Sequence, residues 1–309
     1  TDIFETTQSI VKGEYAEVLS SSAGTITLKS GLWDSYAAAT TTVTKMQMPK
    51  VSVEGLTLLR NSSHQGLQIT CARDVLLGGL YAEGARERLF YFDRVYGGTA
   101  DNLTGRDFWY SGTGTSYGLA VGASQHIKEI GLDLRGGRHA VSHGGSLPTR
   151  DVQTIGGTFD NYHPTVLPCF DHHGACESVK IMGSTLLNGL GSGASNLHVG
   201  GGAVIRGQNR VAVEINPSRS CDYVKLENVD LETTANWPGF RYISRNGSNS
   251  TTLGLLKVDA TIRSVGSGVD IVCNSSSDTG AVIDRLVVRG DVTVSGAAPT
   301  VNIAKNGSA

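Results

Sequence analysis

Charged residues are few in this chain of 309 residues, and neither sign is in excess. Asp, Glu, Lys and Arg make up 17% of the sequence, with 26 basic and 28 acidic residues. No block of Lys and Arg appears, although a protein that binds a nucleic-acid duplex needs one to neutralise the phosphates. We therefore expect no nucleic-acid partner, whereas a charged glycan held in a local groove is compatible with this balance.

Long apolar runs are also missing. No stretch approaches the roughly 20 residues that a membrane helix needs, so we expect no membrane insertion. The start, TDIFETTQSIVKGEY, lacks the basic and apolar regions of a signal peptide. The five cysteines are odd in number and lack CxxC spacing, which favours buried reduced thiols. We expect no metal or other cofactor, with Ca²⁺ at Asp- and Asn-rich turns as an open alternative.

Glycine is abundant, at 40 residues against 7 prolines, and some glycines recur at a regular spacing. Alternating apolar residues surround each one, as in VSVEGLTL, EIGLDL and KIMGST. The successive spacings are 24, 52, 26 and 26 residues. A period of about 24–28 residues with alternation inside it indicates an all-β solenoid, a parallel β-helix. The anchors are Gly55, Gly79, Gly131, Gly157 and Gly183, with Asp107 in the anchor position of the double step.

The first 45 residues do not follow this period. GEYAEVLSSSAGTITLKSGL (13–32) is typical of a β-hairpin, in which a Ser/Gly turn joins two strands. We expect residues 1–45 to form an N-terminal hairpin or cap that leads into the solenoid, and residues 46–309 to form the β-helix domain. Because the end of a solenoid needs a cover, we expect the hairpin over the open end of the first coil.

The densest group of titratable side chains is FDHHGACE, residues 170–177. Successive side chains of a strand point to opposite faces. Phe170 and His172 are therefore expected in the core, and Asp171 and His173 on the outer face. By the same alternation His139 is expected to be buried and hydrogen-bonded.

A guanidinium and a second imidazole complete this patch in the predicted register. Arg206 falls beside His173 on the following coil when Gly207 is aligned with Gly174, and His143 lies on the preceding coil. Carboxylate, imidazole and guanidinium groups within reach of one another are the parts of an acid–base site. The candidate catalytic residues are Asp171, His173, Arg206 and His143. If they form only a salt-bridged surface ladder, the catalytic groups are expected around Asp133, Asp160 and Glu214.

Several segments resemble phage tailspike and polysaccharide depolymerase domains of the pectate-lyase fold, a right-handed parallel β-helix. The entry GEYAEVLSSSAGTITLKSGLWDSY leading to KVSVEGLTL is similar to their N-terminal part, and GGRHAVSHGG, the Asp-x-His at 171–173 and IRGQN are similar to later segments. The resemblance implies an extracellular protein, on a phage tail or secreted by a bacterium. It also implies that the protein degrades a bacterial surface polysaccharide and assembles as a homotrimer.

Two cleavage mechanisms and one non-catalytic role stay open. In β-elimination at a uronic acid, which is slightly favoured, His173 or His143 removes a proton and Arg206 neutralises the carboxylate. Tyr162 then protonates the leaving oxygen. In hydrolysis, Asp171 pairs with a second carboxylate, and their separation decides the stereochemistry. That second carboxylate comes from Glu177, Asp160 or Asp133.

The third alternative is a structural β-helix that only binds a glycan. In either case aromatic side chains are expected to stack on sugar faces, and the loop FDNYHPTVLP is expected to form one wall of a groove. The expected substrate-binding residues are Tyr162, Arg138, Trp109 and Tyr110.

Overall fold

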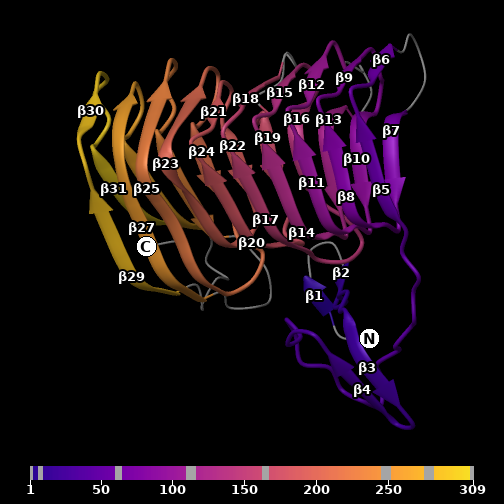
Figure 1. The fold of residues 1–309 in the computed structure, drawn as a ribbon. Helices are drawn as coiled ribbons and strands as arrows, with labels where there is room; N and C mark the ends of the chain where they lie inside the picture. Colours follow the sequence, from indigo (N-terminus) through magenta and orange to yellow (C-terminus); the bar gives the residue numbers. More distant parts are fainter. Residues whose placement is uncertain are drawn as a thin grey trace.

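The computed structural model describes residues 3–5, 10–59, 65–108, 116–161, 167–244, 252–274 and 282–306. Its regular elements are all β-strands, and two parallel sheets carry most of them as a solenoid (Figure 1). The expected all-β parallel β-helix is confirmed. Within the described part of the chain, no helix is long and apolar enough to cross a membrane.

A ten-stranded sheet takes one strand from each coil, and a seventeen-stranded sheet takes the rest. The ten-stranded sheet contains β7 (Gln65–Thr70), β10 (Arg88–Asp93), β13 (Tyr117–Gly122), β16 (His139–Gly144), β19 (Phe170–His172), β22 (Leu190–Ser192), β24 (Val213–Ile215), β26 (Phe240–Ser244), β28 (Val269–Asn274) and β31 (Val301–Asn306). The seventeen-stranded sheet contains β5 (Lys50–Glu54), β6 (Thr57–Leu59), β8 (Arg73–Gly78), β9 (Tyr81–Glu83), β11 (Tyr96–Asp101), β12 (Thr104–Arg106), β14 (Gln125–Ile130), β15 (Asp133–Arg135), β17 (Thr149–Ile155), β18 (Thr158–Asp160), β20 (Cys176–Met182), β21 (Thr185–Leu186), β23 (Ser195–Gly207), β25 (Cys221–Thr233), β27 (Thr252–Ser264), β29 (Val282–Arg289) and β30 (Val292–Val294).

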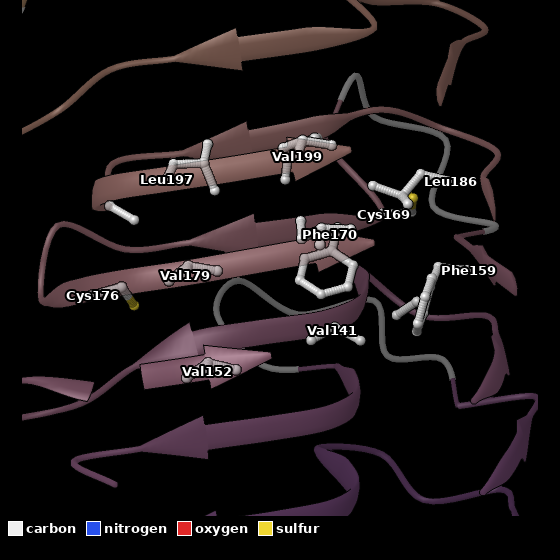
Figure 2. Packing of buried hydrophobic residues seen from close by; sticks show 14 of the residues in the cluster. Val141, Val152, Phe159, Cys169, Phe170, Cys176, Val179, Leu186, Leu197 and Val199 are labelled. Atoms are coloured by element: carbon white, nitrogen blue, oxygen red, sulfur yellow. The ribbon is translucent and has the colours of Figure 1, made fainter. Parts of the chain in front are cut away.

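The core fills the inside of the solenoid with stacked apolar side chains. Val141, Phe170 and Leu190 occupy one register position on successive coils, and each is fully buried. Phe159 packs edge-on against Phe170, with ring centroids 5.1 Å apart (Figure 2). A single coil has no second layer to cover this inner face, so the stability of each coil depends on its neighbours.

The recurring glycines lie at one corner of the coil and have a conformational role. Four of them donate their N–H to the next coil and have φ between 57° and 63°, the left-handed region that disfavours residues other than glycine: Gly55, Gly79, Gly131 and Gly183. The predicted anchors at these positions are confirmed. Two anchors were wrong: Gly156 takes this place rather than Gly157, and Asn102, which tolerates this φ, takes it rather than Asp107.

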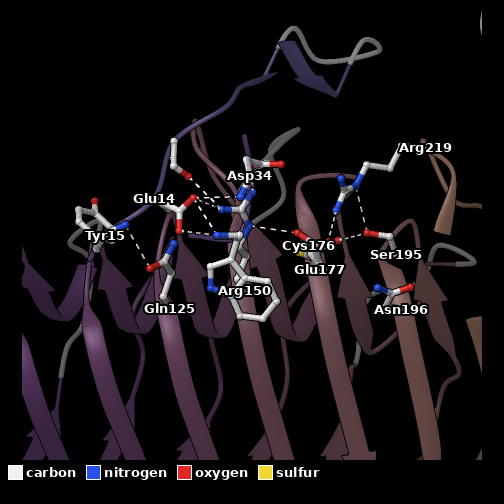
Figure 3. Close-up of polar contacts among 12 residues, drawn as sticks. Glu14, Tyr15, Asp34, Gln125, Arg150, Cys176, Glu177, Ser195, Asn196 and Arg219 are labelled. Atoms are coloured by element: carbon white, nitrogen blue, oxygen red, sulfur yellow. Dashed lines mark hydrogen bonds and ion pairs between the residues drawn. The ribbon is translucent and has the colours of Figure 1, made fainter. Parts of the chain in front are cut away.

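The predicted N-terminal hairpin is present but does not cover the end of the solenoid. β3 (Val18–Ser22) pairs antiparallel with β4 (Thr25–Leu28), and β1 (Ile3–Glu5) pairs with β2 (Ile10–Val11). Residues on both sides of the hairpin dock instead on the flank of the middle coils, where the backbone N–H of Tyr15 donates to Gln125 Oε1 at 3.1 Å (Figures 1 and 3).

A buried arginine explains this position. The Arg150 side chain is fully buried at the start of β17, and its charge is compensated by Glu14, Asp34 and Glu177 (Figure 3). Two of these three carboxylates belong to the N-terminal segment. Because a buried guanidinium without counter-charges is very costly, this ion cluster attaches the segment to the flank and not to the open end.

Candidate functional site: a glycine-floored trough on the ten-stranded sheet

One outward-facing column of the ten-stranded sheet brings titratable residues of successive coils together. Asp171 on β19 is in register with Gly191 on β22, which is in register with Glu214 on β24. Arg241 on β26 and Asp270 on β28 continue the column. Neighbouring strands are about 4.8 Å apart, so the Cα atoms of Asp171 and Glu214 are about 9–10 Å apart, with only a glycine between them.

The middle strand supplies a floor with no side chains. Gly191 on the outer face of β22 and Gly193 just after the strand both line a cavity of about 460 Å³ and form its bottom. A Cβ on Gly191 would lie 2.9 Å from Pro168 Cγ and 3.3 Å from Asp171 Oδ1, so the position admits no side chain without movement of its neighbours. We call this cavity the trough. Its polar and aromatic lining includes Asp171, His173, Arg210, Glu214, Trp237 and Arg241.

The wall on the β19 side pairs a carboxylate with imidazoles. His173 Nε2 lies 3.2 Å from Asp171 Oδ2, and both side chains are partly exposed. His139 lies behind them, and its Nε2 is 3.9 Å from the same oxygen. His139 Nδ1 donates to the Pro168 carbonyl at 2.6 Å, which places the proton of the neutral ring on Nδ1. Burial lowers the pKa of His139 to about 4, against the opposing effect of the Asp171 charge.

The structure confirms both expectations for these strands. Asp171 and His173 face outward side by side, and His139 is 1% exposed and hydrogen-bonded. His173 stands over Gly144 of the preceding coil, where an added Cβ would approach the imidazole to 3.2 Å. The small residue below leaves His173 room to tilt toward Asp171.

The sequence did not predict that the side chains on the β24 side of the trough form one wall. Arg210 is 7% exposed and lies within electrostatic reach of Glu214 and Asp171; burial lowers its pKa and the two carboxylates oppose that shift. Arg241 Nε donates to Asp270 Oδ2 at 3.1 Å. Trp237 also lines the trough and lies 5.8 Å from the Arg241 guanidinium. The glycine spacing in GLGSG (189–193), between strands that carry Asp171 and Glu214, is the sequence signal for this trough.

His143 is not at the surface, and this correction follows from the alternation itself. Its register partners are Val121 and His172, which both point inward. The ring is fully buried, its Nε2 lies 2.7 Å from Glu129 Oε1, and it stacks on His172 at a centroid distance of 5.0 Å. His143 therefore belongs to a buried polar cluster inside the solenoid and does not contact the trough. His172 is buried as expected, with Nδ1 at 3.1 Å from Ser192 Oγ.

Arg206 lies on the other sheet, so its predicted place beside His173 was wrong. It belongs to β23, where it is in register with Glu232 and its Nε pairs with that carboxylate at 3.2 Å. The alignment of Gly207 with Gly174 caused the error, because β22 is the strand that follows β19 in the ten-stranded sheet.

The other predicted residues that the structure describes do not line the trough. Arg138 is half-buried just before β16, and its carbonyl accepts a hydrogen bond from Asn161 Nδ2. Asp133 pairs with Arg106 and Arg135, and Glu177 with Arg150 and Arg219. The Asp160 carboxylate accepts the N–H of Asn161, and burial raises the pKa of Asp160. Tyr162, Trp109 and Tyr110 lie outside the described residues.

Metal-binding groups and cysteines add no second site in the described ranges. No three His, Cys, Asp or Glu side chains there are grouped as a metal ion requires. Cys169, Cys176 and Cys221 are buried free thiols, as expected, and Cys71 is partly exposed. Burial raises the pKa of the Cys169 thiol to about 12, which makes it unreactive near neutral pH.

No family model and no curated protein matches the sequence. Three solved structures are similar, and all are phage tailspikes. The tailspike gp49 of Pseudomonas phage LKA1 matches with a TM-score of 0.58 and 20% identity, over 96% of this chain and 55% of that one. The tailspike gp61 of Pseudomonas phage phi297 matches with a TM-score of 0.64 and 14% identity, over 92% and 55%.

The third is the gp54 tailspike of Acinetobacter baumannii bacteriophage AP22, in complex with a capsular saccharide of A. baumannii. It matches with a TM-score of 0.51 and 17% identity, over 76% of this chain and 48% of that one. The chain thus spans about half the length of the solved tailspikes it matches. At these identities the likeness establishes the fold, and the resemblance to the tailspike β-helix is confirmed at that level.

Proposed function

We propose that this chain degrades a bacterial surface polysaccharide and that glycosidic bonds are hydrolysed in the trough. The observation that carries the proposal is the pair of carboxylates, Asp171 and Glu214, on opposite sides of the glycine floor of β22. The fold shared with phage tailspikes, one of them bound to a capsular saccharide, supports the substrate class. The same neighbours support a place on a phage tail, and the homotrimer remains part of this proposal.

The spacing of the two carboxylates suits an inverting reaction. Inverting glycosidases hold their carboxyl groups about 6.5–9.5 Å apart, which leaves room for a water molecule, whereas retaining enzymes hold them about 5–5.5 Å apart. A Cα separation of about 9–10 Å, with a glycine between, favours the wider class. In this scheme one carboxyl protonates the leaving oxygen, and the other carboxylate removes a proton from the attacking water.

β-Elimination is the second candidate, and it keeps one specific observation in its favour. His173 is partly exposed at the trough, next to Asp171, and is a possible base. With Arg206 on the other sheet, Arg210 or Arg241 would have to neutralise the uronate. We place hydrolysis first because the trough supplies a second carboxylate, Glu214, across Gly191 from Asp171.

Two variants and a matched control test the proposal. A panel of capsular and O-antigen polysaccharides is incubated with the protein, and new reducing ends and the ultraviolet absorbance of unsaturated uronates are followed. Asp171→Asn and Glu214→Gln should each lower the rate by about 10²–10⁴-fold at unchanged melting temperature. Glu232→Gln, an exposed carboxylate on the other sheet, should keep full activity. Full activity of both trough variants would contradict the proposal, and binding without any product would indicate a binding module.

A further inference from the structure

Arg241 uses only part of its hydrogen-bonding capacity within the protein. A guanidinium carries five N–H donors, and the Nε donor binds Asp270 Oδ2 at 3.1 Å. Within the described part of the chain, no hydrogen bond or ion pair involves the two terminal nitrogens of Arg241. The side chain is 25% exposed and lines the trough.

The structure holds this guanidinium in one orientation. Asp270 is 8% exposed in its side chain, and its other oxygen accepts Asn302 Nδ2 at 2.8 Å, so the carboxylate cannot turn freely. On its other side the guanidinium lies 5.8 Å from the Trp237 ring. Because Nε and the ring restrain the group, the terminal donors are presented to a ligand at little entropic cost.

Trp237 gives the same place a surface for a sugar ring. The indole is partly exposed at the trough, three residues before β26, the strand that pairs with β24. A sugar stacked there would cover the Arg241 terminal nitrogens and remove their water. Buried donors need acceptors, and a carboxylate supplies two oxygens in the planar geometry that matches a guanidinium.

We propose that Arg241 and Trp237 form a subsite for an acidic sugar of the polysaccharide, whose carboxylate binds the terminal nitrogens of Arg241. The sugar next to the bond that is cleaved then carries a carboxylate, since Arg241 neighbours Glu214 on the adjacent strand. This inference rests on the proposed function, because it takes the trough as the substrate site.

The test compares an acidic polymer with its carboxyl-reduced form. The polysaccharide from the panel that binds most tightly is treated with carbodiimide and borohydride, which converts its carboxylates to alcohols. Binding of both forms is measured by calorimetry in the Asp171→Asn background, so that the polymer stays intact. The variants are Arg241→Gln and, as the matched control, Arg206→Gln, which removes an arginine that is also paired through Nε but lies on the other sheet.

Reduction of the carboxylates should weaken binding about 10- to 100-fold, the range for charge-assisted hydrogen bonds. The Arg241→Gln variant should bind the acidic and the reduced polymer equally, and it should bind the reduced polymer as tightly as the parent does. The Arg206→Gln variant should keep the parent's difference in affinity between the two forms. The inference is overturned if the best-bound polymer has no acidic sugar, if reduction changes nothing, or if Arg241→Gln weakens both forms equally. A protein that cuts only neutral polymers would overturn the subsite but leave the proposed function intact. Failure to cut or bind any polymer would overturn both.

Discussion

Acidification should destabilise this protein through His139, by an amount that follows from its burial. The ring is 1% exposed, and burial lowers its pKa from 6.5 to about 4. In the unfolded chain His139 binds a proton near pH 6.5, whereas in the folded chain it does so only near pH 4. Stability from this group is therefore present above pH 6.5 and is lost as the pH falls between these two values.

The difference between the unfolded and folded pKa values of His139 determines how much free energy of unfolding is lost. Each pKa unit corresponds to about 1.4 kcal/mol, so the full difference between 6.5 and about 4 is worth about 3 kcal/mol. Most of this, about 2 kcal/mol, should be gone by about pH 5. His172 adds a loss in the same direction, because burial holds its pKa well below the usual value.

Equilibrium urea unfolding at about pH 7 and about pH 5 measures the loss, and His139→Gln isolates the contribution of this residue. The Gln amide can still donate to the Pro168 carbonyl but does not titrate. The variant should be less stable at both pH values, because it leaves a cavity, yet its stability should fall by about 2 kcal/mol less on acidification. An equal fall in parent and variant would refute the reasoning.

Three further predictions concern the trough and the ion cluster of Arg150 with Glu14, Asp34 and Glu177. Arg150→Met leaves three carboxylates around an apolar side chain, so it should lower the free energy of unfolding by about 3–5 kcal/mol. It should also make residues 10–36 sensitive to limited proteolysis, and unchanged protease resistance would contradict the role of this ion cluster. Gly191→Val should fill the trough and reduce cleavage by about 10²-fold, whereas Gly31→Ala, in open space, should have no effect on rate. Proton NMR of the first-formed product should show an inverted anomeric centre, and retention would exclude a water between Asp171 and Glu214.

The face on which a side chain lies could be read from the sequence, because the period of two is a property of each strand alone. It placed Asp171 and His173 outside and His139 inside, and it would have placed His143 inside had it been applied there. The corner glycines were equally readable, since a left-handed φ restricts the residue type locally.

The neighbours of a side chain on adjacent coils could not be read in this way, because coil length varies. The step from Val141 to Phe170 is 29 residues, and the step from Phe170 to Leu190 is 20. The alignment of Gly207 with Gly174 therefore put Arg206 beside His173 and missed β22, the short strand that places Gly191 between Asp171 and Glu214. The position of the N-terminal segment could not be predicted for a related reason. It depends on the charge of Arg150, far away in the sequence, and not on a local pattern.

The mass of the released oligosaccharides tests the central claim most directly. Hydrolysis consumes one water for each bond cleaved, so an internal fragment weighs its sugar residues plus one water, whereas β-elimination adds no water and leaves an unsaturated uronate at the new end. If Asp171 and Glu214 act as acid and base across the trough, every product of a cleaved polysaccharide should weigh a whole number of repeat units plus one water. Asp171→Asn and Glu214→Gln should release little of that product. Products without the added water would contradict the account, and so would full product release from either variant.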